Sequence, residues 1–171
     1  MKPLDIEATL GTAVLLVDTR EQPTAKARAR LAATGLPVAR TALPAGDYSL
    51  MLTRPDGTQL DLSRRIAIER KMDLDELCSC YTRERDRFVR EFERAKENGT
   101  KMYLLIENAS WDLALMGRYR SQMTPKSLVA SMLVWMIRYN CNIVTISDLN
   151  SGRMIREILL REAKMILEEE D

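Results

Sequence analysis

The chain contains no histidine, and this absence excludes several kinds of active site. Without an imidazole, no Ser-His-Asp or Cys-His arrangement can form, and a metal site must use other ligands. Cysteine is also scarce, with Cys78, Cys80 and Cys141 in the whole chain. The Cys78-x-Cys80 spacing is a poor indication of zinc without a second pair, and three thiols cannot all pair with one another. This cysteine content is typical of a reducing compartment, so we expect a cytoplasmic protein.

Long hydrophobic runs and an excess of one charge are missing as well. The longest apolar stretch, residues 128–137 with one serine inside it, is too short to span a bilayer. The N-terminal residues include Lys2, Asp5 and Glu7 and form no continuous apolar segment, so we expect no signal peptide and no membrane attachment. The 26 basic and 25 acidic residues leave a net charge of +1. A nucleic-acid-binding surface would therefore have to come from local clusters of basic side chains.

What is present indicates one globular domain with alternating strands and helices. Its 171 residues are 46% hydrophobic and 30% charged, enough for a full core. Short apolar runs predict strands at 13–17, 38–43, 48–52, from 65 onward, 102–106 and 142–146. Capping residues and helical spacing predict helices at 24–33, 73–96 with a break near 78–81, 110–115, 124–139 and 151–168. This alternation implies an α/β sheet covered on both faces.

The expected domain runs over residues 1–171, and its two ends differ in character. Residues 1–12 are predicted to be a loose leader, the core to span about 13–150, and the last helix to follow it. Pro55-Asp56-Gly57 is a hairpin-type turn. We expect this turn to lead directly into the strand that begins near Arg65.

The stretch from Arg65 to Asp75 is the most informative part of the chain. It starts as an apolar, β-branched run and then changes to charge at Glu69, Arg70 and Lys71. Because successive side chains of a strand alternate between its faces, Glu69 and Lys71 point one way and Arg70 the other. A carboxylate and an ammonium on one face can hold a divalent cation and steady a phosphate oxygen. The alternative is an exposed strand end with a solvated charge cluster.

Acidic residues recur at the ends of three predicted strands. Asp18 and Glu21 follow the first strand, Asp47 opens the third, and Glu69 closes the central one. Strand ends are often polar, so a single acid there means little. If the three strand ends converge, however, their like charges repel one another, and a bound cation relieves that repulsion.

These residues form recognisable motifs. Gly46-Asp47-Tyr48 followed by Ile68-Glu69-Arg70-Lys71-Met72-Asp73-Leu74-Asp75 resembles the GDx…(V/I)ERKxxxD motif of the XPF family of structure-specific nucleases. Residues 17–21 are similar to the first motif of that family, and 104–107 to a later strand. The resemblance covers roughly residues 13–150. It implies a restriction-endonuclease-like fold, with a mixed central sheet flanked by helices, and a dimeric nuclease domain that hydrolyses phosphodiester bonds with a divalent metal.

The resemblance also implies roles for individual residues. Asp18, Asp47 and Glu69 would be ligands of Mg²⁺, for which Mn²⁺ substitutes, and Lys71 the catalytic lysine. The supporting members of the catalytic site would be Glu21, Arg70 and Asp75. From its place on the opposite strand face, we expect Arg70 to pair with an acid such as Asp75 and to hold the strand-to-helix turn.

DNA contacts are expected from arginines near the motif. The family's arginine in the following helix has no single counterpart here, because Arg83, Arg85 and Arg87 all compete for that place. We expect Arg20, Arg83 and Arg87 to contact DNA phosphates. The alternative for the helix arginines is an ordinary solvated face with acidic neighbours as partners. Family members usually add tandem helix-hairpin-helix modules, and none is expected within residues 1–171.

Two predicted helices carry more apolar surface than is needed to cover one face of a sheet. The segment at 128–137 is apolar nearly all round, with Leu133, Trp135, Met136 and Ile137. A core helix is the alternative, but we expect this segment and the last helix to build a homodimer interface. The apolar residues of the last helix that recur at helical spacing are Ile155, Ile158, Leu159 and Ile166.

The sequence therefore predicts a metal-dependent DNA endonuclease that acts on branched, flap or fork DNA. The alternative is a non-catalytic subunit with a nuclease-like fold that binds DNA or pairs with an active chain. Degenerate partners lose metal ligands, whereas Asp18, Asp47, Glu69 and Lys71 are all present here. Their presence favours an active enzyme.

Overall fold

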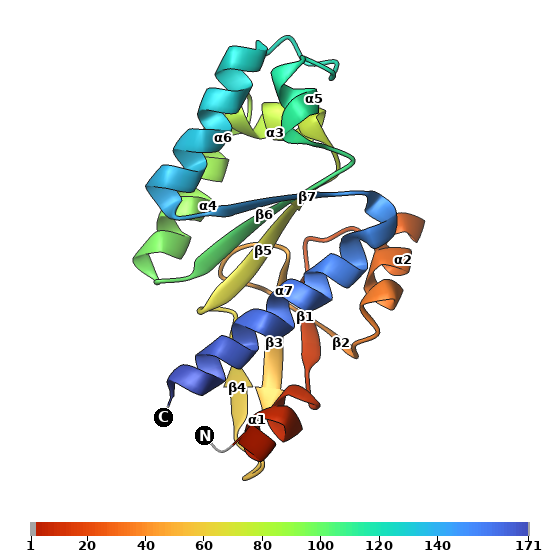
Figure 1. The fold of residues 1–171 in the computed structure, drawn as a ribbon, viewed down its shortest axis with the longest axis vertical. Helices are drawn as coiled ribbons and strands as arrows, with labels where there is room; N and C mark the ends of the chain where they lie inside the picture. The colour runs from red at the N-terminus through yellow and green to blue at the C-terminus, as the bar shows by residue number, and fades with distance from the viewer. Residues whose placement is uncertain (1–2, 171) are drawn as a thin grey trace.

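The computed structural model describes residues 3–170 as a mixed sheet with helices on both faces (Figure 1). Within this range the sheet has seven strands in the order β2-β1-β3-β5-β6-β7, and β4 pairs with β3 beside that path. The strands are β1 (Val14–Asp18), β2 (Val38–Thr41), β3 (Tyr48–Thr53), β4 (Gln59–Asp61), β5 (Ile66–Lys71), β6 (Lys101–Glu107) and β7 (Asn142–Ile146). The predicted α/β architecture is confirmed.

Helices on the two faces of the sheet enclose two separate cores. One face is covered by α3 (Leu74–Tyr81), α4 (Arg85–Glu97), α5 (Trp111–Leu115) and α6 (Pro125–Tyr139). The other is covered by α1 (Pro3–Leu10), α2 (Ala25–Thr34) and α7 (Asp148–Glu169) (Figure 1). The division follows the strand alternation, because Ala67 of β5 packs into the first core and its neighbours Ile66 and Ile68 into the second.

The strand directions explain why distant motifs meet. β3 runs antiparallel to both β1 and β5, with Tyr48 opposite Val17 on one side and Ile68 on the other. The C-terminal ends of β1 and β5 therefore lie at the same edge of the sheet as the start of β3. Parallel pairs join β1 to β2, β5 to β6 and β6 to β7, with helices in the crossovers.

Three expectations about the elements were wrong. Residues 3–10 of the predicted loose leader form α1, whose Ile6 is buried in the core beneath α7; residues 1–2 lie outside the described residues. The turn at Pro55–Gly57 joins β3 to β4, a three-residue strand too short to show a pattern, and not to β5. The last helix begins at Asp148, three residues before the predicted start. The expected break in the 73–96 helix is present between α3 and α4.

The predicted interface residues also lie differently from expectation. Trp135 is 1% exposed and stacks on Phe88 with ring centroids 5.4 Å apart, so it belongs to the core. On α7, Ile155, Leu159 and Ile166 are buried against the sheet. Because α6 and α7 cover opposite faces, they do not form one continuous apolar surface. On α6 itself, Leu133, Val134 and Ile137 remain exposed.

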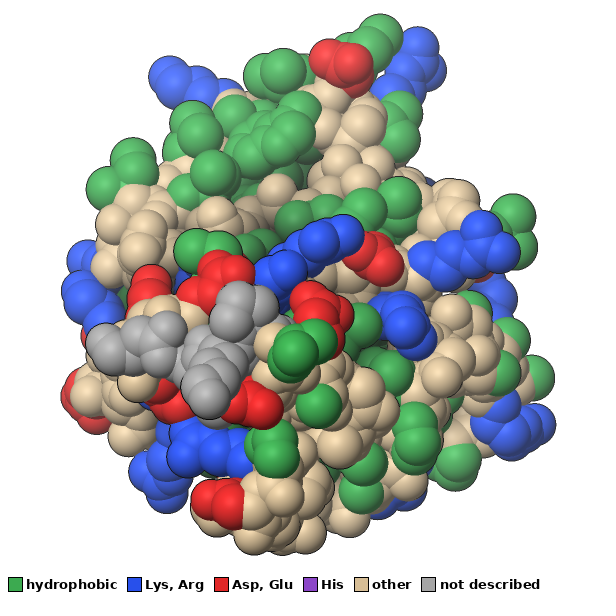
Figure 2. All heavy atoms as spheres, turned by 60° about the horizontal axis from the view of Figure 1, so that its bottom comes forward, with side chains coloured by type: hydrophobic (Ala, Val, Ile, Leu, Met, Phe, Trp, Pro, Cys, Tyr) green, Lys and Arg blue, Asp and Glu red, His purple; other side chains and the backbone are tan. Residues whose placement is uncertain are grey.

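The outer surface carries both charges. Figure 2 shows Lys and Arg side chains interspersed with Asp and Glu side chains on the face that includes the lower end of Figure 1. Hydrophobic side chains gather in the upper part of the same view. None of the helices within residues 3–170 combines the length and the apolar character needed to span a bilayer.

The closest helix contact depends on a glycine. Gly152 of α7 packs directly on α2, and a Cβ built there would lie 2.2 Å from the carbonyl oxygen of Arg30 and 2.8 Å from the Cβ of Ala33. Backbone atoms cannot move aside as a flexible side chain can. Any larger residue at position 152 must therefore push α2 away from α7.

Gly152→Ala should destabilise the fold despite the better helix propensity of alanine. Alanine gains about 1 kcal/mol in a helix interior, whereas overpacking costs typically about 1–3 kcal/mol. We expect a net loss in the free energy of unfolding, measured by urea denaturation. Arg153→Ala, on the exposed side of the same helix, is the control and should change stability little. A Gly152→Ala protein more stable than wild type would contradict the close approach.

Candidate active site

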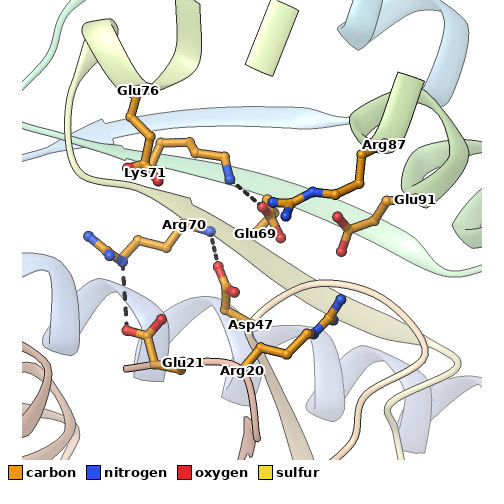
Figure 3. A pocket seen from close by; sticks show the side chains of 9 residues that line it. All are labelled: Arg20, Glu21, Asp47, Glu69, Arg70, Lys71, Glu76, Arg87 and Glu91. Atoms are coloured by element: carbon orange, nitrogen blue, oxygen red, sulfur yellow. Dashed lines mark hydrogen bonds and ion pairs between the residues drawn. The ribbon is translucent and has the colours of Figure 1, made fainter. Parts of the chain in front are cut away.

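A cavity of about 210 Å³ lies where β1 and β5 end and β3 begins (Figure 3). The motif strands, the loops after β1 and before β3, and helices α3 and α4 all contribute side chains to it. The lining residues are Arg20, Glu21, Asp47, Glu69, Arg70, Lys71, Glu76, Arg87 and Glu91. Five acidic and four basic side chains thus face one small space.

Backbone hydrogen bonds to β1 and to β5 hold Asp47 in place. Its carbonyl oxygen accepts from the amide of Asp18, 2.9 Å away, and its own amide donates to the carbonyl of Ile68, 2.8 Å away. Gly46 permits this approach: its φ is +71°, and a Cβ there would lie 2.9 Å from the Ile68 oxygen. Asp47 Oδ2 accepts from the Arg70 amide at 2.7 Å. The side chain is half-buried, and desolvation raises its pKa to about 6.

Glu69 and Lys71 point to the same face of β5, as the strand alternation predicts. Both are 5% exposed, and Lys71 Nζ lies 2.5 Å from Glu69 Oε1. Burial and the nearby charge of Asp47 raise the pKa of Glu69 well above its usual value. Burial also works against the charged lysine, but the carboxylates of Glu69 and Asp47 outweigh it and raise the pKa of Lys71. The ammonium is therefore the counter-ion of the two acids.

Glu91 of α4 is a site residue that the sequence analysis missed. It is buried, lines the cavity, and accepts from the Gly46 amide at 3.0 Å. Its spacing from the apolar residues of α4 could have identified it, because it lies on the same helical face as the buried Phe88, Phe92 and Ala95. An acid among apolar neighbours on an inner face needs a partner, and here the partner is the loop that carries Asp47.

Arg70 lies on the opposite strand face and joins a network of charges there. Its Nη1 donates to Glu107 Oε2 at 3.0 Å, and its Nε lies 4.0 Å from Glu21 Oε1. Arg30 of α2, 5% exposed, donates to the other oxygen of Glu107 at 2.9 Å and to Glu21 at 2.8 Å. Tyr48 completes the group with a hydrogen bond to Glu21. The network ties α2 and β6 to the cavity. No sequence pattern indicates this role of Arg30.

The predicted pairing of Arg70 with Asp75 is not formed. Asp75 Oδ1 accepts from the backbone amides of Arg120 and Ser121 at 2.8 and 2.7 Å, and Oδ2 pairs with the Arg120 side chain at 3.2 Å. It lines a second cavity on α3 together with Arg83. Asp75 follows its helix cap by two residues, so it turns away from the strand end and toward the loop before α6.

Asp18 is also placed apart from the other two predicted metal ligands. Its Oδ1 accepts from the side chain and the amide of Arg20 at 2.6 and 2.8 Å, and its Oδ2 from the Leu43 amide at 2.8 Å. Against the effect of burial, these hydrogen bonds lower the pKa of Asp18. The carboxylate does not line the cavity, and among residues 3–170 no group of three acids or cysteines could hold a metal ion. A metal-binding role of Asp18 stays a prediction.

The predicted DNA-contacting arginines are divided between the two cavities. Arg20 and Arg87 line the first, although Arg20 binds Asp18 and Arg87 pairs with Glu84 at 3.2 Å. Arg83 lines the second. Both Arg20 and Arg87 keep most of their side-chain surface exposed, so each has donors facing solvent.

Asp47 and Glu69 fit a divalent cation. Both are hard oxygen donors that face one cavity, and burial raises the pKa of each because it disfavours the charged form. Mg²⁺ is usually held by one or two carboxylates and keeps several waters, so a pair of acids is sufficient. The negative charges of Glu21 and Glu91 add to this effect on Asp47.

Comparison with solved structures shows that the fold of this chain is a known one. Among solved structures, XPF from Aeropyrum pernix is similar over 86% of this chain, with 23% identity and a TM-score of 0.61. XPF from Aeropyrum pernix in complex with DNA is similar over 89% of this chain, with 20% identity and a TM-score of 0.61. The chain spans 60% and 66% of the length of those two chains. At this identity the likeness shows the fold. No curated protein shows a significant sequence match.

The family follows from the sequence profile. A model described as the ERCC4 domain matches residues 17–156, which run from the last two residues of β1 to the first turns of α7 and include every residue that lines the candidate active site. Because the match covers far more than half of the chain, this protein belongs to the ERCC4-domain family, the XPF-type nuclease family that its motifs indicate.

Proposed function

We propose that this protein is a divalent-metal-dependent DNA endonuclease that hydrolyses phosphodiester bonds. The observation that carries the proposal is the pair of carboxylates of Asp47 and Glu69, which face one cavity with Lys71 beside them. Their mutual repulsion and desolvation favour a bound cation, Mg²⁺ or Mn²⁺. The fold shared with a DNA-bound XPF supports DNA as the substrate.

Seven of the nine residues that line the cavity then have a defined task. Asp47 and Glu69 would hold the cation, which when bound supplies charge neutralisation at the phosphate and a more acidic water. Lys71 stays charged beside Glu69 and is placed to steady a phosphate oxygen or the attacking water. Arg87 and Arg20 offer guanidinium donors at the rim. Arg70 and Glu21 hold the strand ends in register from the opposite face.

Branched, flap or fork DNA is the substrate class that the cavity fits. Glu69 and Lys71 are buried, so the scissile phosphate has to enter the cavity. A strand that is splayed from its partner can do so more easily than one held in a stiff duplex. The alternative function is a non-catalytic DNA-binding subunit. It is disfavoured because Asp47, Glu69 and Lys71 are all present and brought together.

We further propose that the protein forms a homodimer through α6. Ala130, Leu133, Val134 and Ile137 are exposed at helical spacing and make one apolar stripe; Ile137 is 83% exposed. If two copies cross antiparallel about a two-fold axis between Leu133 and Val134, the small Ala130 of one faces the large Ile137 of the other. The stripe is thus complementary to itself.

Asp47→Asn should separate catalysis from folding. Removal of one repelling charge leaves the packing intact, so without metal the variant should melt no lower than wild type, and its stability should rise by up to about 1 kcal/mol. Stabilisation by added Mg²⁺ or Mn²⁺ should largely vanish because the ligand is lost. Cleavage of flap and fork DNA should fall by several orders of magnitude, while DNA binding persists.

Melting curves with and without metal, run beside a nicking assay, measure these effects. Asp112→Asn is the matched control, since Asp112 is exposed at the start of α5, and it should behave as wild type. If Asp47→Asn cleaves at nearly the wild-type rate, Asp47 has no part in the site.

Ile137→Glu should convert the dimer into a monomer without loss of stability, because the side chain is exposed in the single chain. Analytical ultracentrifugation of wild type and variant gives the two masses. Met165→Glu, which places the same charge at an exposed position on α7, should remain dimeric. A wild-type protein that sediments as a monomer at high concentration would contradict the proposed interface.

A further inference from the structure

A second cavity lies on the side of α3 that faces the loop before α6. Its volume is about 660 Å³, against about 210 Å³ for the candidate active site. The two cavities adjoin the same turn of α3, since Glu76 lines the first and its neighbour Asp75 the second. The proposed catalytic residues account for the first cavity only.

The second cavity is rich in hydrogen-bond donors and positive in charge. Arg83 and Arg120 line it, and the carboxylate among its lining residues is that of Asp75. Both oxygens of this carboxylate are already engaged, by the amides of Arg120 and Ser121 and by the Arg120 side chain. A guanidinium carries five donors, whereas Arg83 uses one on Ser79 Oγ at 3.0 Å and Arg120 one on Asp75. Each arginine therefore has donors left for a ligand.

The other side chains that line the cavity are polar, except for that of Met123. Ser79, Ser121 and Gln122 supply neutral donors and acceptors, and Met123 supplies an apolar, polarisable side chain. Asp75 fixes this wall, because it holds the loop at residues 120 and 121 through two backbone hydrogen bonds. Phosphate oxygens would match the arginines, and a sugar or base would match Met123.

We propose that this cavity binds single-stranded DNA, as the continuation of the strand whose phosphate occupies the candidate active site. The inference rests on the proposed nuclease function and adds a strand-binding subsite to it. The second cavity is larger than an isolated phosphate ion. It adjoins the same turn of α3 as the candidate active site, so the nucleotides next to the scissile phosphate can reach it. Asp75 is then a positioning residue for the subsite, which explains why it lies apart from Glu69 and Lys71.

The test is the binding of a fluorescein-labelled single-stranded oligonucleotide, measured by anisotropy in EDTA so that no cleavage occurs. Arg83→Ala/Arg120→Ala should weaken binding about tenfold and reduce the salt slope by roughly 1.4, because each phosphate contact to a single strand contributes about 0.7. Binding of the matching blunt duplex should change less. The control is Arg64→Ala/Arg65→Ala, which removes two exposed arginines at the start of β5, and it should bind as wild type.

A second variant tests whether the arginine substitutions weaken binding only because they loosen the loop before α6. Gln122→Glu keeps the size of an exposed side chain and leaves the Asp75 contacts intact, yet it places a negative charge in the cavity. It should weaken single-strand binding several-fold with an unchanged melting temperature.

Three results would overturn the inference: unchanged binding by both cavity variants, an equal loss in the β5 control, or a loss confined to duplex DNA. Because the assay contains no metal, it is independent of catalysis. A wild-type protein that binds through this cavity but never nicks DNA would instead overturn the proposed nuclease function.

Discussion

The site depends on one constraint, which is that the backbone of Asp47 is hydrogen-bonded to the strands on both sides. The Asp18 amide donates to the Asp47 carbonyl, and the Asp47 amide donates to the Ile68 carbonyl. These bonds bring the ends of β1 and β5 to the start of β3, and Gly46 is the residue that lets the loop pass within 3 Å of β5. The backbone of Asp47 is therefore tied to the ends of β1 and β5, which sets the place of its carboxylate in the cavity that Glu69 also lines.

Charges on the two faces of the sheet are compensated in different ways. On the α2 face, the guanidiniums of Arg30 and Arg70 divide the oxygens of Glu107 between them, so the buried acid is fully paired. On the α4 face, Lys71 is the cation that touches Glu69, while Asp47 and Glu91 add negative charge nearby. Removing one partner of a buried ion pair typically costs about 3–5 kcal/mol. The acids of the first face are thus neutralised by its own arginines, whereas the second face leaves negative charge that a divalent cation can neutralise.

The sequence was most informative where the local pattern decides the structure. Alternation along β5 predicts that Glu69 and Lys71 share a face, and the acids at strand ends indicate the sheet edge where Asp47 and Glu69 meet. Glu91 and Arg30 could not be predicted in this way, since helices bring them to the strands by tertiary packing alone. A strand end also cannot show that Arg20, two residues after Asp18, folds back onto the Asp18 carboxylate. Likewise, Asp75 lies beyond a helix cap, and its orientation depends on a loop 45 residues away in sequence.

The central claim is that Asp47 and Glu69 together hold the divalent cation. The most direct measurement is an anomalous difference map from crystals of the protein soaked in Mn²⁺. The account predicts a peak between the two carboxylates, with metal–oxygen distances of about 2.1 Å as expected for a small divalent cation, and with Lys71 displaced from Glu69. A peak on Asp18 or Asp75 with none between Asp47 and Glu69, in a protein that nicks DNA with Mn²⁺, would contradict it.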